Sequence, residues 1–155
     1  MSSQVELRAA ERDDREYIER VLSRNGLPVA DISEKLSSLY ICETETKRVG
    51  VGGIELHDDA GLLRSVAVEE SARGNGYGTI ISNKVLARTR AAGVSTAYLL
   101  TTTADEFFAD LGFEEIPRET VPPSIQTTTE FSDLCPETAV CMKRELNRSK
   151  TVTDD

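Results

Sequence analysis

The stretch VAVEESARGNGYGT, residues 66–79, joins an apolar run to a helical pattern through three closely spaced glycines. The glycines alternate with single larger residues: Gly74, Asn75, Gly76, Tyr77, Gly78. Each glycine weakens a strand or a helix by about 0.5–1 kcal/mol relative to alanine. Three glycines at one junction therefore imply a compensating use, and we infer that the backbone closely approaches a ligand there.

A helix start that follows such a turn favours an anionic ligand. The first N–H groups of a helix have no partner within it, and the helix dipole adds about half a positive charge there. Arg73 adds a full charge beside them. Two other phosphate motifs are excluded, because Ile81 stands where the dinucleotide fingerprint requires its third glycine and Thr79 where a P-loop that starts at Gly74 requires its second. We expect the amides of residues 73–79 to hold a diphosphate group.

Upstream of this turn, the hydrophobic pattern predicts a strand, two helices and an antiparallel meander. Alternation predicts the strand over 5–9. Apolar residues at helical spacing predict a helix that is capped by Asp13 with Glu16 and ended by Asn25-Gly26. A second short helix is expected over 31–36. Three strands of the meander follow, over 39–43, 48–56 and 62–68. The middle one carries three glycines, which imply that another backbone or a ligand lies close to it.

Downstream of the turn, helices and strands alternate. The expected elements are a helix over 80–92, a strand over 95–102, a helix over 104–112, a strand that opens at Phe113, a helical turn near Ile125 and a strand over 139–146. The first of these helices makes a β-α-β crossover, which joins parallel strands. This order indicates a mixed α/β domain on one central sheet. We expect a single domain over 1–147 and a disordered polar tail over 148–155.

The composition argues against several classes of partner. A formal net charge of −9, with no evident basic patch, argues against nucleic acid and against an anionic membrane surface. No apolar run reaches the ~18 residues that span a bilayer, and residues 1–10 lack the pattern of a signal peptide, so a cytoplasmic location is expected. The acidic composition fits both a salt-adapted organism and ordinary acidic solubility.

The cysteines and the single histidine offer little for a metal site. Cys42, Cys135 and Cys141 are odd in number, which without a signal peptide points to reduced thiols. The cysteine spacing matches no zinc pattern, and His57 is the only histidine, so no metal is expected. Three thiolates could bind trivalent arsenic, but we favour the alternative that these are buried small apolar side chains.

The run RGNGYG after the strand 62–68 resembles the acetyl-CoA signature of the GNAT N-acetyltransferase superfamily, Arg/Gln-x-x-Gly-x-Gly/Ala. Arg73, Gly76 and Gly78 fill it. The run FFADLGF, residues 107–113, is similar to that family's F-Y-x-x-x-G-F. The resemblance covers nearly the whole chain and implies a central mixed sheet of about seven strands flanked by about four helices. A narrower likeness, in LLRSVAV, AYLLTTTADEFFADLGF and VPPSIQTTTEFSDLCPETAVCM, is to the branch labelled arsenic-resistance N-acetyltransferases.

The resemblance implies acetyl-CoA as cosubstrate, with no metal. In that fold the fourth and fifth strands splay apart to leave a slot for the thioester, the fourth strand contacts pantetheine, and the glycine turn holds the diphosphate. The cofactor-binding residues implied here are Val66, Ala67, Val68, Arg73, Gly74, Asn75, Gly76, Tyr77, Gly78, Thr79, Phe107 and Phe108. The backbone N–H of Val68 would polarise the thioester carbonyl. Phe107 and Phe108 would line the pantetheine slot, with a purely structural core role as the alternative.

The catalytic groups are predicted on the strand 48–56 and near the helix 104–112. Glu55 is the candidate general base, and a surface charge at a strand end is its alternative. Phe108 occupies the position where the family carries its tyrosine proton donor. Cys135 or Tyr98 would replace that donor if the fold brought either one near, but we favour a thiolate that leaves unassisted.

Substrate recognition is predicted at the residues before the cofactor strand. Arg64 and Ser65 are expected to hold an anionic group of the acceptor, with an exposed strand arginine as the alternative. The long connection 118–138 is expected to act as a lid, with residues 127–130 facing the acceptor.

The leading function is acetyl-CoA-dependent N-acetylation of a small amine, with an amino acid that carries an arsenic- or phosphorus-based acid as the candidate acceptor. Two alternatives stay open: a non-catalytic acyl-CoA sensor, which Phe108 motivates, and acetylation of a protein lysine or N-terminus, which the acidic composition motivates. Analogy with proteins of this fold favours a homodimer.

Overall fold

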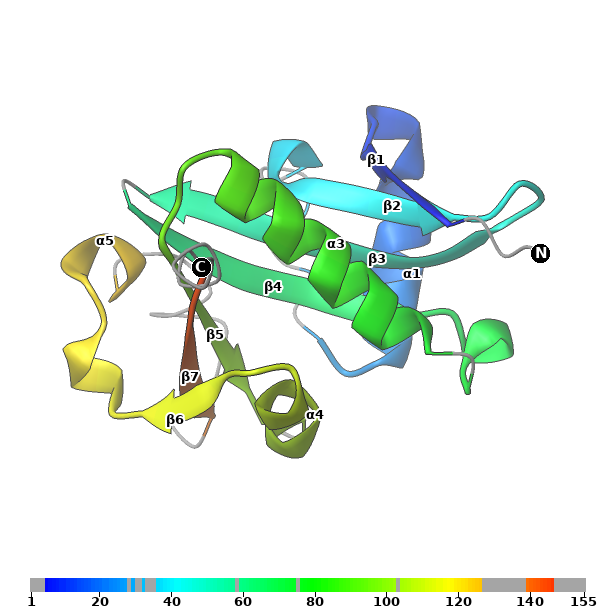
Figure 1. The fold of residues 1–155 in the computed structure, drawn as a ribbon. Coiled ribbons are helices and arrows are strands. Elements are labelled where there is room, and N and C mark those ends of the chain that lie inside the picture. The colour runs from blue at the N-terminus through cyan, green and yellow to red at the C-terminus, as the bar shows by residue number, and fades with distance from the viewer. Residues whose placement is uncertain are drawn as a thin grey trace, which may run out of the picture. The chain divides into compact units, whose positions relative to one another are not determined.

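The computed structural model describes residues 5–27, 29, 32, 36–57, 59–74, 76–102, 104–126 and 139–146. Its seven strands form one sheet in the order β1-β2-β3-β4-β5-β7-β6 (Figure 1). The strands are β1 (Glu6–Ala9), β2 (Leu39–Glu43), β3 (Arg48–His57), β4 (Ala60–Val68), β5 (Thr96–Thr101), β6 (Glu114–Ile116) and β7 (Val140–Glu145). The α-helices of the described residues are α1 (Arg15–Arg24), α3 (Tyr77–Ala91), α4 (Asp105–Asp110) and α5 (Pro123–Gln126). The prediction of a mixed α/β fold with about seven strands and about four helices is confirmed.

The chain divides into two compact units. Unit 1 comprises Met1–Ile54 and Arg64–Val85, and unit 2 comprises Glu55–Leu63 and Leu86–Asp155. Four short 3-10 helices complete the described elements: η1 (Arg12–Asp14), η2 (Leu36–Ser38), η3 (Glu70–Ala72) and η4 (Arg118–Thr120). The single domain over 1–147 stays a prediction. The expected tail over 148–155 lies outside the described residues, as does most of the helix expected over 31–36.

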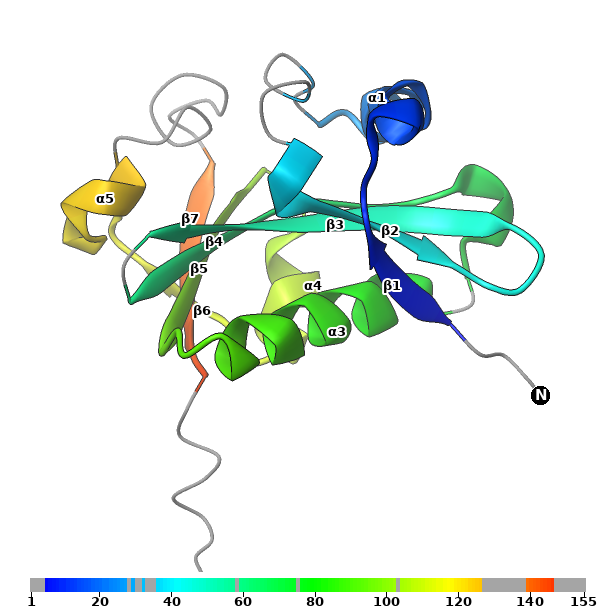
Figure 2. The same cartoon turned by 90° about the horizontal axis from the view of Figure 1, so that it is seen from above.

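In unit 1, two helical segments cover opposite faces of the strands. β1 pairs antiparallel with β2, and β2 pairs antiparallel with β3. Helix α1 lies on one face of these strands and the first part of α3 on the other (Figure 2). The face of α1 that was predicted to be apolar is buried in a cluster with residues of β2, β3 and β4: Tyr17, Ile18, Val21, Leu22, Ile32, Leu39, Ile41, Val51 and Ala67.

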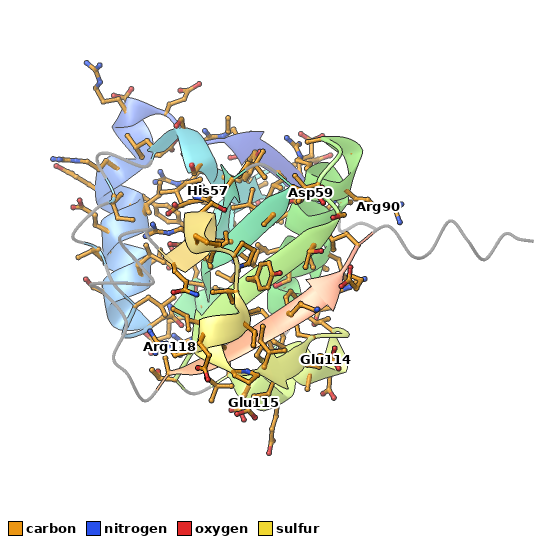
Figure 3. All side chains as sticks on the ribbon, turned by 90° about the vertical axis from the view of Figure 1, so that its left-hand side faces the viewer. His57, Asp59, Arg90, Glu114, Glu115 and Arg118 are labelled. Atoms are coloured by element: carbon orange, nitrogen blue, oxygen red, sulfur yellow. The ribbon has the colours of Figure 1, made fainter. Side chains whose placement is uncertain are left out.

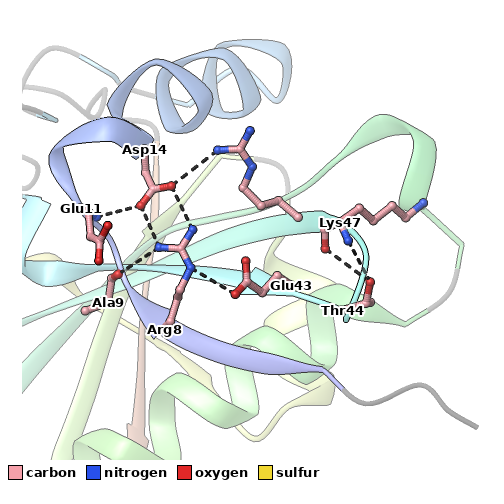
Figure 4. A network of polar contacts seen from close by, with 8 residues as sticks. Arg8, Ala9, Glu11, Asp14, Glu43, Thr44 and Lys47 are labelled. Atoms are coloured by element: carbon pink, nitrogen blue, oxygen red, sulfur yellow. Dashed lines mark hydrogen bonds and ion pairs between the residues drawn. The ribbon is translucent and has the colours of Figure 1, made fainter.

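The start of α1 differs from the prediction. The 3-10 helix η1 precedes it, and Asp14 rather than Asp13 accepts the N-terminal hydrogen bond, from the Glu11 N–H at 2.8 Å. The Asp14 carboxylate also accepts two bonds from the guanidinium of Arg8, at 2.9 and 3.0 Å, and Arg8 reaches Glu43 at 3.1 Å (Figure 4). These contacts join β1, β2 and the start of α1. The Arg8 guanidinium holds the pKa of Asp14 below its ordinary value of 3.8.

The glycines of β3 are explained by close packing. A Cβ atom at Gly52 would lie 2.6 Å from Cγ2 of Ile81 in α3. At Gly50 it would lie 2.5 Å from the backbone oxygen of Ala67, and at Gly53 2.5 Å from Cδ2 of Leu39. These neighbours come from the protein itself, so helix α3 and the adjacent backbone are what require glycine on this strand.

Unit 2 is built around β5 and β7. β5 pairs antiparallel with β7, β7 pairs antiparallel with β6, and the first residues of β4, Ala60–Leu62, pair in parallel with Thr96–Tyr98 of β5. The parallel pairing agrees with the predicted crossover. A buried cluster fills this unit: Ala60, Leu62, Tyr98, Leu100, Val121, Ile125, Ala139 and Cys141. Ile125 belongs to α5, the helical turn that was expected near it.

Candidate active site

The glycine turn in unit 1 combines left-handed backbone with the start of α3. Gly74 has φ of +85° and Gly76 has φ of +79°, a region that L-residues other than glycine rarely adopt. Helix α3 begins at Tyr77, three residues before the predicted start, so Gly78 and Thr79 lie in its first turn. The Ile80 N–H bonds to the Gly76 carbonyl at 3.2 Å. The N–H groups of residues 77–79, which precede this bond, therefore have no partner within the helix.

Arg73 lies exposed beside this turn. Its Nη2 donates to Oδ1 of Asn25, at the end of α1, over 3.0 Å. The Asn25 side chain also donates to the Val68 carbonyl at 3.4 Å, so one amide joins Arg73 to the end of β4. Sequence reasoning treated Asn25 only as part of a helix stop and missed these contacts. Asn75, another predicted site residue, lies outside the described residues.

The predicted pantetheine strand, residues 66–68, is the last part of β4. Ala67 is buried in the cluster under α1, whereas Val66 and Val68 are half-buried. The backbone directly before them is unusual, because Ser65 has φ of +59° in the middle of the strand. A non-glycine residue in this region costs about 1–2 kcal/mol, so the surrounding structure holds Ser65 in a strained conformation.

Arg64, one of the two predicted acceptor residues, is buried. Only 2% of it is exposed, and its Nε donates to Oγ of Ser65 at 3.1 Å. The alternative interpretation of Arg64 as an exposed strand arginine is therefore wrong. The two predicted acceptor residues contact each other at the strained position of β4.

Glu55, the predicted base, belongs to unit 2 and is also buried, with 3% exposed. Its Oε1 lies 3.3 Å from Nε2 of His57, whose side chain is 29% exposed. His57 is labelled in Figure 3. The alternative interpretation of Glu55 as a surface charge is wrong. Sequence reasoning did not connect His57 with Glu55, although residues two apart on a strand share a face and this spacing was a usable signal.

The aromatic residues of α4 pack with each other in unit 2. The Phe108 ring meets those of Phe107 and Phe113 edge-on, with centroids 4.9 and 5.8 Å apart. Phe108 is buried and Phe107 half-buried. These contacts give Phe108 a role in the core, and its contact with pantetheine stays a prediction.

The alternative proton donors and thiol ligands are buried or lie outside the described residues. Burial raises the pKa of Tyr98, which makes it a weaker acid than free tyrosine. Burial also raises the pKa of Cys42 and Cys141 to about 11, so both thiols stay protonated near neutrality. Cys135 and residues 127–130 of the expected lid lie outside the described residues.

Within the part of the chain that the structure describes, no group of three or more histidine, cysteine, aspartate or glutamate side chains could hold a metal ion. Among the same residues, no helix is both long and apolar enough to cross a membrane.

A comparison with protein families decides the family. Residues 35–115, more than half of the chain, match the family described as acetyltransferase (GNAT) domain. The chain belongs to the GNAT acetyltransferase family. The match includes Glu55, β4 and the glycine turn. Comparison with curated protein sequences gives no match.

Solved structures share this GNAT fold at low sequence identity. N-acetylglutamate synthase from Neisseria gonorrhoeae, complexed with coenzyme A and L-arginine, superposes with a TM-score of 0.80 at 22% identity, over 95% of this chain and 34% of that one. The chain thus spans about a third of the length of that synthase. Rv2747 from Mycobacterium tuberculosis, in complex with CoA, gives 0.76 at 24% identity over 91% and 99% of the two chains.

A third solved structure is of an enzyme named for a protein acceptor. The ribosomal-protein-S18-alanine N-acetyltransferase from Escherichia coli gives a TM-score of 0.70 at 16% identity, over 92% of this chain and 94% of that one. At these identities, the three likenesses show a common fold.

Proposed function

We propose that this GNAT protein is an acetyl-CoA-dependent N-acetyltransferase that acts on a small amine. One observation carries the proposal: the left-handed turn at Gly74 and Gly76 leads into the start of α3, with Arg73 alongside. The solved structures of the synthase and of Rv2747 with coenzyme A support the same cosubstrate.

The turn fits a diphosphate. A Cβ atom built at Gly74 or at Gly76 would meet no atom within 4 Å, so the space beside this backbone is open. Amide N–H groups at a helix start and a guanidinium are both strong partners for phosphate oxygens. The amides of residues 73–79 and the Arg73 side chain would hold the two phosphates, and the backbone of residues 66–68 would contact pantetheine.

Acetyl-CoA supplies the acetyl group as an activated thioester. In the proposed reaction, Glu55 accepts a proton from the acceptor amine, so that the nitrogen lone pair can form the amide bond. The Val68 N–H stabilises negative charge on the carbonyl oxygen. Phe108 has no proton to give and burial raises the pKa of Tyr98, so we assign no side chain as donor to the leaving thiolate.

The acceptor that we propose is an amino acid with a further anionic group, such as an arsenic- or phosphorus-based acid. Arg64 supports this class, because it is a buried cation next to Ser65 in the strand before the pantetheine residues. A further structure of the Neisseria synthase holds coenzyme A and N-acetyl-glutamate, whose side chain ends in a carboxylate. We also propose a cytoplasmic location and a homodimer.

A second candidate is acetylation of a protein N-terminus. The likeness to the ribosomal-protein-S18-alanine enzyme favours it, and a net charge of −9 suits a basic peptide.

A measurement of thiol release tests both candidates. Acetyl-CoA is offered with glutamate, with amino acids that carry arsenic or phosphorus acids, with uncharged amines and with a basic peptide. We expect the anionic amino acids to react fastest, and Arg64→Lys to raise their KM while leaving the KM of acetyl-CoA unchanged. Fastest reaction of the peptide would favour the second candidate. Binding of coenzyme A without turnover of any amine would favour the non-catalytic sensor.

A further inference from the structure

Asn25 is a polar side chain at the end of α1 that makes contacts with three separate segments of unit 1. Its Nδ2 donates to the Val21 carbonyl at 2.8 Å and to the Val68 carbonyl at 3.4 Å. Its Oδ1 accepts from Nη2 of Arg73 at 3.0 Å. The side chain thereby links the last turn of α1, the last residue of β4 and the arginine of the glycine turn.

The bond to Val21 belongs to the end of α1, but the helix end does not require the contacts with Val68 and Arg73. Asn25 has an ordinary negative φ of −100°, and the left-handed conformation that ends the helix falls on Gly26, with φ of +72°. Backbone N–H groups close the helix, since that of Asn25 reaches the Leu22 carbonyl and that of Gly26 the Ser23 carbonyl, each at 3.0 Å. The contacts of the amide with Val68 and Arg73 therefore serve something other than helix termination.

The chemistry of the contacts matches an amide and no other short side chain. Carbonyl oxygens accept and a guanidinium only donates, so the group between them must have donors on one side and an acceptor on the other. Asparagine supplies both without a charge. An aspartate here would pair with Arg73 as an ion and would compete with any anion for its positive charge.

We propose that Asn25 is a positioning residue that orders Arg73 for the diphosphate of coenzyme A; this inference rests on the proposed function. Arg73 is an exposed, long side chain, and fixing such a side chain on binding costs conformational entropy. The bond to Asn25 meets part of that cost before the ligand arrives. Because Asn25 also bonds to the Val68 carbonyl, it would keep Arg73 in a fixed position relative to the predicted pantetheine strand.

A double-mutant cycle tests this role. The Kd of coenzyme A is measured by calorimetry for the wild type, Asn25→Ala, Arg73→Ala and the double variant, with Ser23→Ala, an exposed residue of α1, as the control. Losing one hydrogen bond to a charged group should raise Kd about fivefold or more in Asn25→Ala. Because Asn25 acts through Arg73, the double variant should bind no more weakly than Arg73→Ala alone.

Two results would overturn the inference: an unchanged Kd in Asn25→Ala, or the same loss whether Arg73 is present or absent. If Arg73→Ala itself leaves Kd unchanged, the proposed diphosphate site fails, and the role of Asn25 with it. Thermal unfolding of each variant separates a loss of folding from a loss of affinity. Asn25→Asp provides a second variant, which should weaken coenzyme A binding but not the binding of pantetheine, because pantetheine lacks the diphosphate. Equal weakening for both ligands would also overturn it.

Discussion

Glu55 is a carboxylate that the fold buries almost completely, 3.3 Å from the partly exposed ring of the only histidine. A buried carboxylate needs hydrogen-bonding partners, and His57 gives it one. Kinetics test the proposed base role of Glu55 directly.

Glu55→Gln should lower kcat by roughly 10²-fold or more near neutral pH, because the variant cannot accept the proton of the amine. The loss should shrink as pH rises toward the pKa of the acceptor amine, where the neutral amine exists without a base. Steady-state rates of thiol release across pH measure this. Glu145→Gln, whose side chain is 49% exposed, is the matched control and should keep its activity. Near wild-type kcat for Glu55→Gln at neutral pH would remove the base role.

Ser65 should respond to substitution through its backbone. Both Ser65→Gly and Ser65→Ala remove the hydroxyl that Arg64 contacts, so their comparison tests the tolerance of φ +59°, against the greater flexibility that glycine gives the unfolded chain. We expect the glycine variant to be the more stable by about 1 kcal/mol. At Ala67, in the same strand, replacement by glycine should instead destabilise the protein. Chemical denaturation measures the free energies of unfolding, and a less stable glycine at position 65 would contradict the assigned strain.

At the scale of elements, the fit between β3 and α3 depends on missing side chains. Gly50 and Gly52 face the helix, and Ile81 occupies the space that their Cβ atoms would need. This explains the glycines that sequence reasoning attributed to a ligand or another backbone. The same close packing fixes the position of α3 against β3, and the start of α3 forms the proposed phosphate site.

A pair of substitutions separates the two glycines. Gly52→Ala should destabilise the protein by about 1–3 kcal/mol through its clash with Ile81, and the cost should fall in an Ile81→Ala background. Gly50→Ala should stay costly in that background, because its clash at 2.5 Å is with the backbone oxygen of Ala67. Denaturation of the single and double variants gives the comparison. Equal rescue at both positions would show that the packing is described wrongly.

The elements also show what the sequence could predict. β2 has the predicted bounds because β-branched and aromatic residues between polar neighbours form a local signal. Helix α3 starts earlier than predicted, because a glycine in the first turn sits where its N–H has no helical partner in any case. The sequence predicts Asp13 as the capping residue of α1, whereas Asp14 makes the hydrogen bonds there. The partner of Asp14 is Arg8 on β1, and no local spacing in the sequence reveals that contact.

The candidate site also has features that the sequence predicts and features that depend on long-range packing. The glycine turn is contiguous in sequence, so its residues could be named without a structure. Glu55 and Arg64 were named, but their burial depends on long-range packing, which left a surface role open for both. The contact of Asn25 with Arg73 joins residues 48 apart in the chain, and no pattern in a single sequence predicts it.

At the scale of the whole molecule, the stability of this acidic protein should depend on pH through Asp14. Arg8 lowers the folded-state pKa of Asp14 below 3.8, so the pair contributes its full stability above about pH 4, and this contribution is lost as pH falls through the folded-state pKa. Asp14→Asn should therefore lower Tm near neutral pH, and its difference from the wild type should shrink below pH 3.8.

Thermal unfolding across pH checks this dependence on Asp14. Asp110→Asn, at an exposed position of α4, serves as the control for a general loss of negative charge. A Tm difference for Asp14→Asn that stays constant down to the most acidic pH would contradict the assigned ion pair.

The proposed site for coenzyme A can be observed amide by amide. In a titration followed by two-dimensional NMR of the nitrogen-15-labelled protein, coenzyme A should shift the backbone N–H signals of residues 73–79 saturably, and pantetheine should shift them much less. We expect the largest changes at Gly76, Gly78 and Thr79, around the start of α3. Unchanged signals in this turn, while coenzyme A shifts others or none, would contradict the proposed diphosphate site.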